Sequence, residues 1–382
     1  MAMITRMTDT DFYKLTMGQA VLHRFPEAHA VYAFKCRTPE VELGRFAEAI
    51  QDEIDAMANL ALTSTEDRAL RGYRFLTDDY VDWLNSYRFD PDEVTLSAQA
   101  DGTLDVRVQG PWARTIYWEV PLLAIIQEVA MRHRAPNPDW AGARQALEDK
   151  IALVNERDPE GNFCFADFGT RRRFSGAWQA EVVARTAQAL PERFVGTSNV
   201  AFAIDNNIPA IGTMAHEYLQ AAQALAPDLR HFQAYALEHW MQEFRGDLGI
   251  ALTDVIGMNA FLDDFDRLFA KAYDGLRHDS GDPIAWGEAA IRHYQEHGID
   301  PRTRTLIFSD SLDFPTALDI LSHFKGRIRV SFGIGTNLTH DIPGVTPLNS
   351  VMKLVELNGQ PVAKLSDAPG KTMCEDAEYV QR

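Results

Sequence analysis

The chain has 382 residues, of which 46% are hydrophobic and 24% charged, so it is long enough for two domains or for one barrel with an added module. Its formal net charge of −18, from 55 acidic residues against 37 lysines and arginines, argues against a nucleic-acid-binding or anionic-membrane-binding surface. Three widely spaced cysteines without a CxxC pair disfavour a zinc site or a disulfide framework, and without a signal-peptide-like or membrane-spanning apolar run we expect a cytoplasmic protein.

The first third of the sequence mixes predicted helices with antiparallel strands. Thr8–Arg24 has apolar residues at nearly helical spacing after a good capping residue, and Ala30–Lys35 is predicted to be a strand. Asp101-Gly102 separates two strand-like runs, which is a strong hairpin signal. We therefore expect residues 1–112 to form an α+β module, with further helices over 40–59 and 65–85 and hairpin strands over 94–100 and 103–110.

The middle of the chain alternates short apolar runs with helical segments. Helices are predicted over Glu119–Arg134 and Trp140–Arg157, and strand-like runs follow, each ending in glycine or polar residues. Such runs, most of them linked by helices, indicate a parallel α/β barrel or a long doubly wound sheet, and we expect a barrel domain over residues 113–345. The seven runs are 162–168, 194–197, 210–214, 248–253, 275–277, 305–308 and 328–332.

The last segment returns to antiparallel structure. Val351–Ser366 contains Asn358-Gly359, the signature of a type I′ hairpin turn. We expect residues 346–382 to pack on the N-terminal module. The predicted fold class is therefore α/β, with an irregular TIM-like barrel beside an α+β module built from both ends of the chain.

GLRHDSGDP, residues 275–283, brings the most chemistry together in one short stretch. Arg277 and Asp279 lie two residues apart at the predicted end of a strand, so their side chains point the same way, and Ser280 begins a tight turn. Arginine can bind phosphate with two N–H groups, and aspartate can accept from ribose hydroxyls or hold a divalent cation. The pattern indicates a phosphorylated, polyhydroxylated ligand, although an ordinary surface turn with a local ion pair has the same sequence.

Two other turns after predicted strands suit an anionic ligand. Phe168 and Arg171 follow one strand with a glycine between them, so they could enclose a flat aromatic acid by stacking and charge. Gly333 and Gly335 belong to a Gly-Ile-Gly loop after the last run, whose backbone N–H groups could reach phosphate oxygens. The loop matches neither GxGxxG nor a P-loop, so it indicates a phosphate site only in combination with Arg277.

His216 follows the third strand-like run and precedes Glu217. It is a candidate general base, metal ligand or nucleophile toward phosphate, or else a hydrogen-bonded structural residue. The second histidine of HExxH is missing, which disfavours a zinc peptidase. In a barrel the residues just past each strand meet at one face, and these positions hold Phe168, Arg171, Ser198, His216, Asp254, Arg277, Asp279, Asp310, Gly333 and Gly335.

As a set, nine segments resemble the nicotinate phosphoribosyltransferases of the bacterial and fungal type. They run almost end to end in the order expected for that family, and no single one would be specific. They are Thr10–Met17, FGTRRRFS at 168–175, GTSNV at 196–200, GTMAHE at 212–217, LGIALTD at 248–254, GLRHDSGDP at 275–283, FSDSLD at 308–313, SFGIGTNLT at 331–339 and KLVELNGQPVAKLSD at 353–367.

The resemblance implies a type II phosphoribosyltransferase fold and the joining of nicotinate to 5-phosphoribosyl 1-diphosphate, with ATP as co-substrate and Mg²⁺ as cofactor. The products would be nicotinate mononucleotide and diphosphate, with ADP and phosphate, in NAD salvage. A homodimer with shared active sites is also implied, in which Tyr13 closes over the pyridine of the neighbouring subunit. For the metal, Asp279 and Asp310 are the candidate ligands.

The resemblance also implies roles for single residues. His216 would be transiently phosphorylated by ATP, Phe168 would stack on the pyridine ring, and Arg171 would face its carboxylate. Ser198 stands where nicotinamide-using relatives carry aspartate, and a hydroxyl there favours the acid as substrate because a carboxylate would repel it. The phosphoribosyl diphosphate would be bound by Arg277, Asp279, Ser280, Gly333 and Gly335.

Three alternatives remain open on the sequence. The first is a related phosphoribosyltransferase that acts on nicotinamide or quinolinate, which turnover of the acid against the amide would distinguish. The second is a phosphosugar aldolase or isomerase on a TIM barrel, but a Schiff-base aldolase needs a lysine at a strand end and none of the seven runs supplies one. The third is a non-catalytic sensor of sugar phosphates, which would show no turnover.

Overall fold

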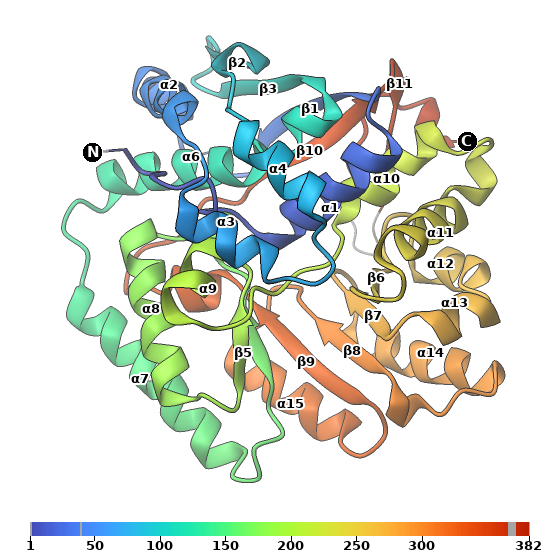
Figure 1. Ribbon diagram of the computed structural model, residues 1–382. Helices are drawn as coiled ribbons and strands as arrows, with labels where there is room; N and C mark the ends of the chain where they lie inside the picture. The colour runs from blue at the N-terminus through green and yellow to red at the C-terminus, as the bar shows by residue number, and fades with distance from the viewer. Residues whose placement is uncertain (1, 39, 366–371, 382) are drawn as a thin grey trace.

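Figure 1 shows the computed structural model, which describes residues 2–38, 40–365 and 372–381. Its strands form two sheets, one antiparallel and one parallel, so the chain is a mixed α/β protein. The antiparallel sheet has the strand order β11-β10-β1-β3-β2. Its strands are β1 (His29–Cys36), β2 (Val94–Ala98), β3 (Leu104–Pro111), β10 (Ser350–Leu357) and β11 (Gln360–Pro361).

Strand β10 brings the C-terminal part of the chain into this sheet, as the sequence predicts. It pairs antiparallel with β1 in a register that sets Ala30 opposite Leu357. The turn into β11 has positive φ at Asn358 (52°) and Gly359 (77°), as a type I′ turn requires. The side-chain oxygen of Asn358 also accepts a hydrogen bond from the N–H of His29 at 2.9 Å. The turn is therefore tied to the first residue of β1.

The parallel sheet has the strand order β5-β4-β9-β8-β7-β6 and lies below the antiparallel sheet in the view of Figure 1. Six of the seven predicted runs are strands of this sheet. Helices flank it, and strands shielded in this way are short and almost continuously apolar, which is why the runs were visible in the sequence. The strands are β4 (Phe165–Asp167), β5 (Phe194–Thr197), β6 (Ile250–Leu252), β7 (Gly275–His278), β8 (Thr305–Phe308) and β9 (Arg329–Ile334).

Two of the long predicted helices have the predicted bounds, α6 (Glu119–Arg134) and α7 (Trp140–Arg157). The single helix expected over 65–85 is instead two, α3 (Ser64–Arg71) and α4 (Asp78–Ser86), and the aromatic residues between them pack against α1. The other α-helices are α1 (Phe12–Arg24), α2 (Ala47–Ala56), α5 (Trp112–Thr115), α8 (Gly176–Ala189), α9 (Val200–Asn206), α10 (His216–Leu225), α11 (Phe232–Phe244), α12 (Met258–Asp264), α13 (Arg267–Ala272), α14 (Pro283–Glu296), α15 (Phe314–Phe324) and α16 (Thr336–Thr339).

The run at 210–214 is not a regular strand, which corrects the sequence prediction. Ala210 forms one isolated parallel bridge with Thr197, at the end of β5. Thr213 Oγ1 donates a hydrogen bond to the carbonyl oxygen of Ile250, at the start of β6, at 3.0 Å. The segment also packs against the start of α1, so it lacks the room for a ladder on both sides. Regular strand pairing therefore leaves the sheet open between β5 and β6.

The two sheets meet around a small set of buried helices. Helix α1 is buried along its first ten residues, so it is central to the fold and not a surface helix. Strand β10 lies against both α6 and α10, so these elements enclose the region where the parallel strands end. Within the described residues, no helix has both the length and the apolar character needed to span a bilayer.

Candidate active site

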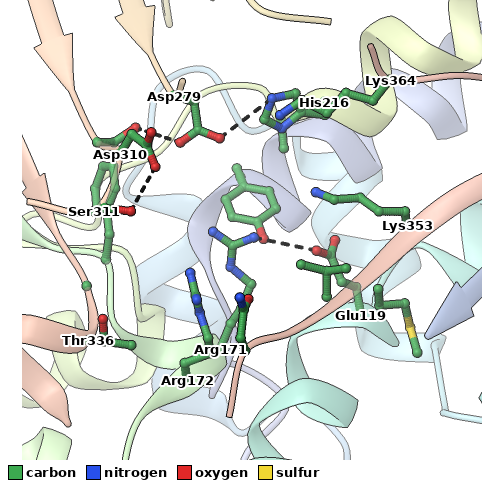
Figure 2. A pocket seen from close by; sticks show the side chains of 18 of the residues that line it. Glu119, Arg171, Arg172, His216, Asp279, Asp310, Ser311, Thr336, Lys353 and Lys364 are labelled. Atoms are coloured by element: carbon green, nitrogen blue, oxygen red, sulfur yellow. Dashed lines mark hydrogen bonds and ion pairs between the residues drawn. The ribbon is translucent and has the colours of Figure 1, made fainter. Parts of the chain in front are cut away.

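A cavity of about 330 Å³ lies where the carboxyl ends of the parallel strands face β10 (Figure 2). Because parallel strands all end at one edge of their sheet, the loops after β4, β7, β8 and β9 all reach it. The residues predicted from the sequence that line this cavity are Tyr13, Phe168, Arg171, His216, Arg277, Asp279, Asp310 and Gly335.

His216 is the first residue of α10 and is almost fully buried. Its Nε2 lies 2.7 Å from Asp254 Oδ1 and 3.6 Å from Asp279 Oδ2. Burial, together with the nearby Lys364 ammonium, lowers the pKa of His216 to about 4. The imidazole is therefore neutral near pH 7, and the contact with Asp254 assigns its proton to Nε2, which leaves the lone pair on Nδ1.

Asp254 joins His216 to two further polar groups. Its second carboxylate oxygen accepts a hydrogen bond from Ser280 Oγ at 2.7 Å and lies 3.0 Å from Lys364 Nζ. Burial opposes ionisation, but His216, Lys364 and Ser280 hold the pKa of Asp254 well below its usual range. Ser280 is not among the residues that line the cavity, and its hydroxyl contacts Asp254 there; its predicted contact with a ligand stays a prediction.

Two carboxylates stand at the ends of β7 and β8. Asp279 Oδ1 accepts a hydrogen bond from Ser309 Oγ at 3.1 Å, and Asp310 Oδ1 accepts one from Ser311 Oγ at 3.0 Å (Figure 2). The guanidinium of Arg277 also reaches the cavity, and its buried Nε has no hydrogen-bond partner in the described part of the chain. An unpartnered donor beside a cavity is available to an anionic ligand.

Asp279 belongs to a compact set of possible metal ligands. One atom each of His216, Asp254 and Asp279 lies within 4.8 Å of the others. Asp254, however, already faces the ammonium of Lys364, which would repel a metal ion at that oxygen. Carboxylate oxygens are the ligands that Mg²⁺ prefers, so Asp279 fits a magnesium ion better than Asp254 does.

The rings of Phe168 and Tyr13 and the guanidinium of Arg171 also line the cavity, and we call the space that these three side chains border the ring slot. The ring of Phe168 covers Gly333, where an added Cβ would come within 2.2 Å of it. The guanidinium of Arg171 lies 5.8 Å from the centroid of Tyr13, so a cation and two aromatic rings border the same space. The Tyr13 ring that lines this cavity belongs to the same chain, and its predicted role across a subunit interface stays a prediction. Gly333 makes room for Phe168 and does not itself line the cavity.

Ser198 is not among the residues that border the cavity, and its direct contact with a ligand stays a prediction. It is 3% exposed, and its Oγ donates a hydrogen bond to Asp11 Oδ1 at 2.7 Å. The other oxygen of Asp11 lies 3.6 Å from Arg171 Nε. Ser198 therefore influences the slot through Asp11 and Arg171. Its position just after a strand placed it near the site, but only the fold shows which way its side chain points.

The antiparallel side of the cavity carries basic residues that the sequence reasoning missed. Lys353, in the middle of β10, and Lys364, after β11, point toward the space between Glu119 and His216 (Figure 2). Burial lowers the pKa of Lys353 to about 8, although Glu119 opposes the shift. Arg37, just past β1, also lines the cavity. The sequence feature that could have identified these residues was the pair of lysines on either side of the predicted hairpin. Such a pair is also typical of an ordinary solvent-exposed strand face.

Comparison with known proteins gives a consistent result over the whole chain. Residues 163–382 match the model of the nicotinate phosphoribosyltransferase (NAPRTase) family, and residues 8–127 match the model of its N-terminal domain. The chain is 51% identical to the nicotinate phosphoribosyltransferase of Cupriavidus necator, with 99% of this chain and 96% of that protein covered. It is 48% identical to the enzyme of the same name from Burkholderia cenocepacia, over 99% and 95% of the two chains.

Solved structures agree. The crystal structure of nicotinate phosphoribosyltransferase from Porphyromonas gingivalis superimposes with a TM-score of 0.94 at 39% identity, covering 99% of this chain and 98% of that one. The one from Vibrio cholerae gives 0.95 at 38% identity, covering 99% and 92%. Both family models, the near-complete coverage and the cavity with its ring slot lead to one conclusion: the chain belongs to the nicotinate phosphoribosyltransferase family.

Proposed function

We propose that this chain transfers the phosphoribosyl group of 5-phosphoribosyl 1-diphosphate to nicotinate, forming nicotinate mononucleotide and diphosphate in NAD salvage, coupled to hydrolysis of ATP. The observation that carries the proposal is that one cavity combines a ring slot bordered by Arg171 with a neutral His216 and an array of basic side chains. A flat acid, a phosphosugar and a reactive histidine are the three requirements of this reaction.

Nicotinate would lie in the slot between Phe168 and Tyr13, with its carboxylate toward Arg171. Aromatic rings bind a flat ring by offset stacking, and a guanidinium binds a carboxylate with two N–H groups. Ser198 would favour the acid indirectly, because its hydroxyl satisfies Asp11 and so reduces the competition for Arg171.

The phosphoribosyl donor would extend from this slot toward β10. Arg277 and Asp279 would take the ribose and phosphate oxygens, and the backbone at Gly335 the 5-phosphate. Lys353 and Lys364 would neutralise the diphosphate as it leaves. Breaking the bond from ribose to diphosphate builds positive charge on the sugar and negative charge on the leaving group, so cations held in place beside the diphosphate lower the barrier.

His216 would be the group that ATP phosphorylates. Its Nδ1 lone pair would attack the terminal phosphorus of ATP, forming an N–P bond as the bond to ADP breaks, and water would later cleave the N–P bond to release phosphate. The Asp254 carboxylate supports this role because it holds the imidazole by Nε2 and stabilises its positive charge. Replacing His216 by alanine is expected to abolish stimulation by ATP more than basal transfer.

Magnesium would be held by Asp279 and Asp310, whose oxygens border the cavity. When bound, the ion supplies positive charge that offsets the charge of the diphosphate. The serines beside these two aspartates, Ser309 and Ser311, orient the carboxylates by donating to one oxygen of each.

We also propose the larger-scale features that the family resemblance implies. Segment 210–214 would complete an irregular barrel, which is supported by its contacts with the end of β5 and the start of β6. Residues 1–112, 113–345 and 346–382 would be the structural divisions. A cytoplasmic homodimer with shared active sites is also part of the proposal.

The test is a coupled assay of the purified chain with ATP, Mg²⁺, the phosphoribosyl donor and either nicotinate or nicotinamide, following mononucleotide and ADP together. Nicotinate mononucleotide formed together with ADP is the expected result. Use of nicotinamide at an equal rate would overturn the acid specificity. Absence of product with either pyridine would overturn the proposed reaction and favour a sensor of sugar phosphates.

A further inference from the structure

Arg171 lies close to two carboxylates without a hydrogen bond to either. Its Nε is 3.6 Å from Asp11 Oδ2. Its Nη1 is 3.7 Å from Glu119 Oε1 (Figure 2). Both separations are longer than an N–H···O hydrogen bond. An arginine normally forms a short, two-pronged contact with a nearby carboxylate, so these long separations need a cause.

Each carboxylate has a closer partner on its other oxygen. Asp11 accepts from the Ser198 hydroxyl at 2.7 Å. Glu119 Oε2 lies 2.6 Å from the ammonium of Lys14. The side chain of Lys14 is fully buried, and the same ammonium is also paired with Glu217. Glu119 is therefore already neutralised from the side opposite Arg171.

Lys14 occupies a junction of three helix starts. It lies in the first turn of α1, Glu119 is the first residue of α6, and Glu217 is the second residue of α10. Despite its burial, the two carboxylates raise the pKa of Lys14, so the ammonium stays charged. Glu217 is held on its other oxygen by the hydroxyl of Tyr32 at 3.3 Å, so the junction is fixed from several elements.

We infer that Lys14 is a positioning residue that keeps the guanidinium of Arg171 available for the carboxylate of the pyridine ligand, by giving Glu119 a shorter ion pair. The inference rests on the proposed function, since it assumes that a pyridine carboxylate enters the slot. Without the ammonium, Glu119 would be a buried carboxylate with Arg171 as its nearest cation, and the two would close into a direct pair. The guanidinium would then be drawn out of the slot.

The sharpest test compares two double variants with the same composition. Lys14→Met with Glu217→Gln leaves Glu119 as a carboxylate without its lysine, so it should capture Arg171. Lys14→Met with Glu119→Gln removes the competitor and leaves Glu217, which makes no ion pair with Arg171 among the described residues. Each pair of changes removes one ammonium and one carboxylate, so neither variant buries two unpaired carboxylates.

Equilibrium binding of nicotinate and of nicotinamide, measured by calorimetry, gives the readout. We expect the Lys14→Met/Glu217→Gln variant to bind nicotinate about tenfold more weakly than the Lys14→Met/Glu119→Gln variant, which is within the usual coupling between contacting charged groups. Nicotinamide has no carboxylate, so its affinity should be the same in both. Lys325→Met, at an exposed lysine paired with Glu160 away from the cavity, is the control for the lysine-to-methionine change itself.

Equal nicotinate affinities in the two double variants, or equal losses for the acid and the amide, would overturn the inference and leave Lys14 as a structural residue only. The proposed function fails in a different way. If the wild-type protein binds nicotinate but forms no mononucleotide, the proposed reaction is wrong. The comparison of the two double variants would still decide the role of Lys14.

Discussion

The two walls of the cavity are built by different means. On the parallel side, the charged groups stand just past strand ends, as Asp279 and Asp310 do, and acids are mixed with arginines. The charged side chains that the antiparallel sheet and the segments next to it bring to the cavity are basic, and Lys353 comes from the middle of a strand, while Glu119 and Glu217 reach the cavity from α6 and α10. Arg37 and Lys364 come from the ends of two other segments.

This difference shows how a strongly acidic protein can bind an anionic substrate. The ends of the parallel strands supply the carboxylates Asp254 and Asp279 that contact His216, while a second sheet brings the opposing charge across the cavity. The cavity thus combines His216 and the carboxylates and arginines of the parallel side with the basic side chains of the antiparallel side. Three kinds of substitution separate the contributions of the two walls. They alter the Asp254 contact that links the walls, the Lys353 ammonium, and the packing around the Phe168 ring.

Asp254→Asn changes the contact that joins the walls. The Asp254 carboxylate contacts His216 and Ser280 from the parallel side and Lys364 from the antiparallel side. An amide would no longer neutralise the lysine or stabilise a charged imidazole, so kcat/KM is expected to fall roughly 100-fold, as for loss of an acid–base partner. The measurement is steady-state kinetics with parallel detection of ³²P on His216. Labelling and turnover at wild-type levels would show that the two walls act independently.

The lowered pKa of Lys353 predicts that kcat/KM for the donor depends on pH through a residue of the antiparallel wall. Its pKa of about 8 means that the free enzyme loses this ammonium as the pH rises through about 8, so affinity for the anionic donor is present below that pH and lost above it. The profile of kcat/KM for the donor should therefore have an alkaline limb. Lys353→Arg should move this limb to higher pH, because arginine stays protonated.

Lys353→Met should remove the limb and lower kcat/KM for the donor about tenfold at pH 7, in the lower range for truncating a charged partner. The KM for nicotinate should change less. An alkaline limb that persists unchanged in Lys353→Met would assign the titration to another group and break the link between this wall and the donor.

Gly333→Ala tests the packing of the ring slot on the parallel side. An added methyl group would come within 2.2 Å of the Phe168 ring, which would have to move into the slot. Overpacking of this kind costs about 1–3 kcal/mol, so a several-fold increase in the KM for nicotinate is expected. Gly335→Ala is the comparison, because its nearest neighbour is 3.3 Å away and is not the ring itself. Equal effects on the nicotinate KM would refute a specific role of Gly333 in placing Phe168.

The sequence predicted the parallel wall far better than the other. Strands buried by flanking helices are short apolar runs, and their polar ends mark the edge of the sheet, so His216, Asp279 and Phe168 were found from local signals. Lys14 and Lys353 were missed because a lysine in an alternating or helical pattern is normally solvent-facing. Their burial depends on carboxylates far away in the sequence, and such pairs leave no local pattern.

The same limit applies to the direction of single side chains. Ser198 and Ser280 follow strands of the parallel sheet, and the hydroxyl of each donates to a neighbouring carboxylate, Asp11 or Asp254. The run at 210–214 has the apolar character of a strand, yet helix α1 packs against it. Tertiary contacts decide where a side chain points and whether a run pairs as a strand. The spacing of residues along the chain does not encode those contacts.

The pairing of β1 with β10 has a consequence for biosynthesis. Strand β1 is made long before its partner β10, which sets Leu357 opposite Ala30. In the interval between the two, that edge of β1 is an open template for the strands of other chains. Contacts so distant in sequence also form slowly. Yield in the cell should therefore depend on how well nascent chains are shielded during the interval before β10 emerges.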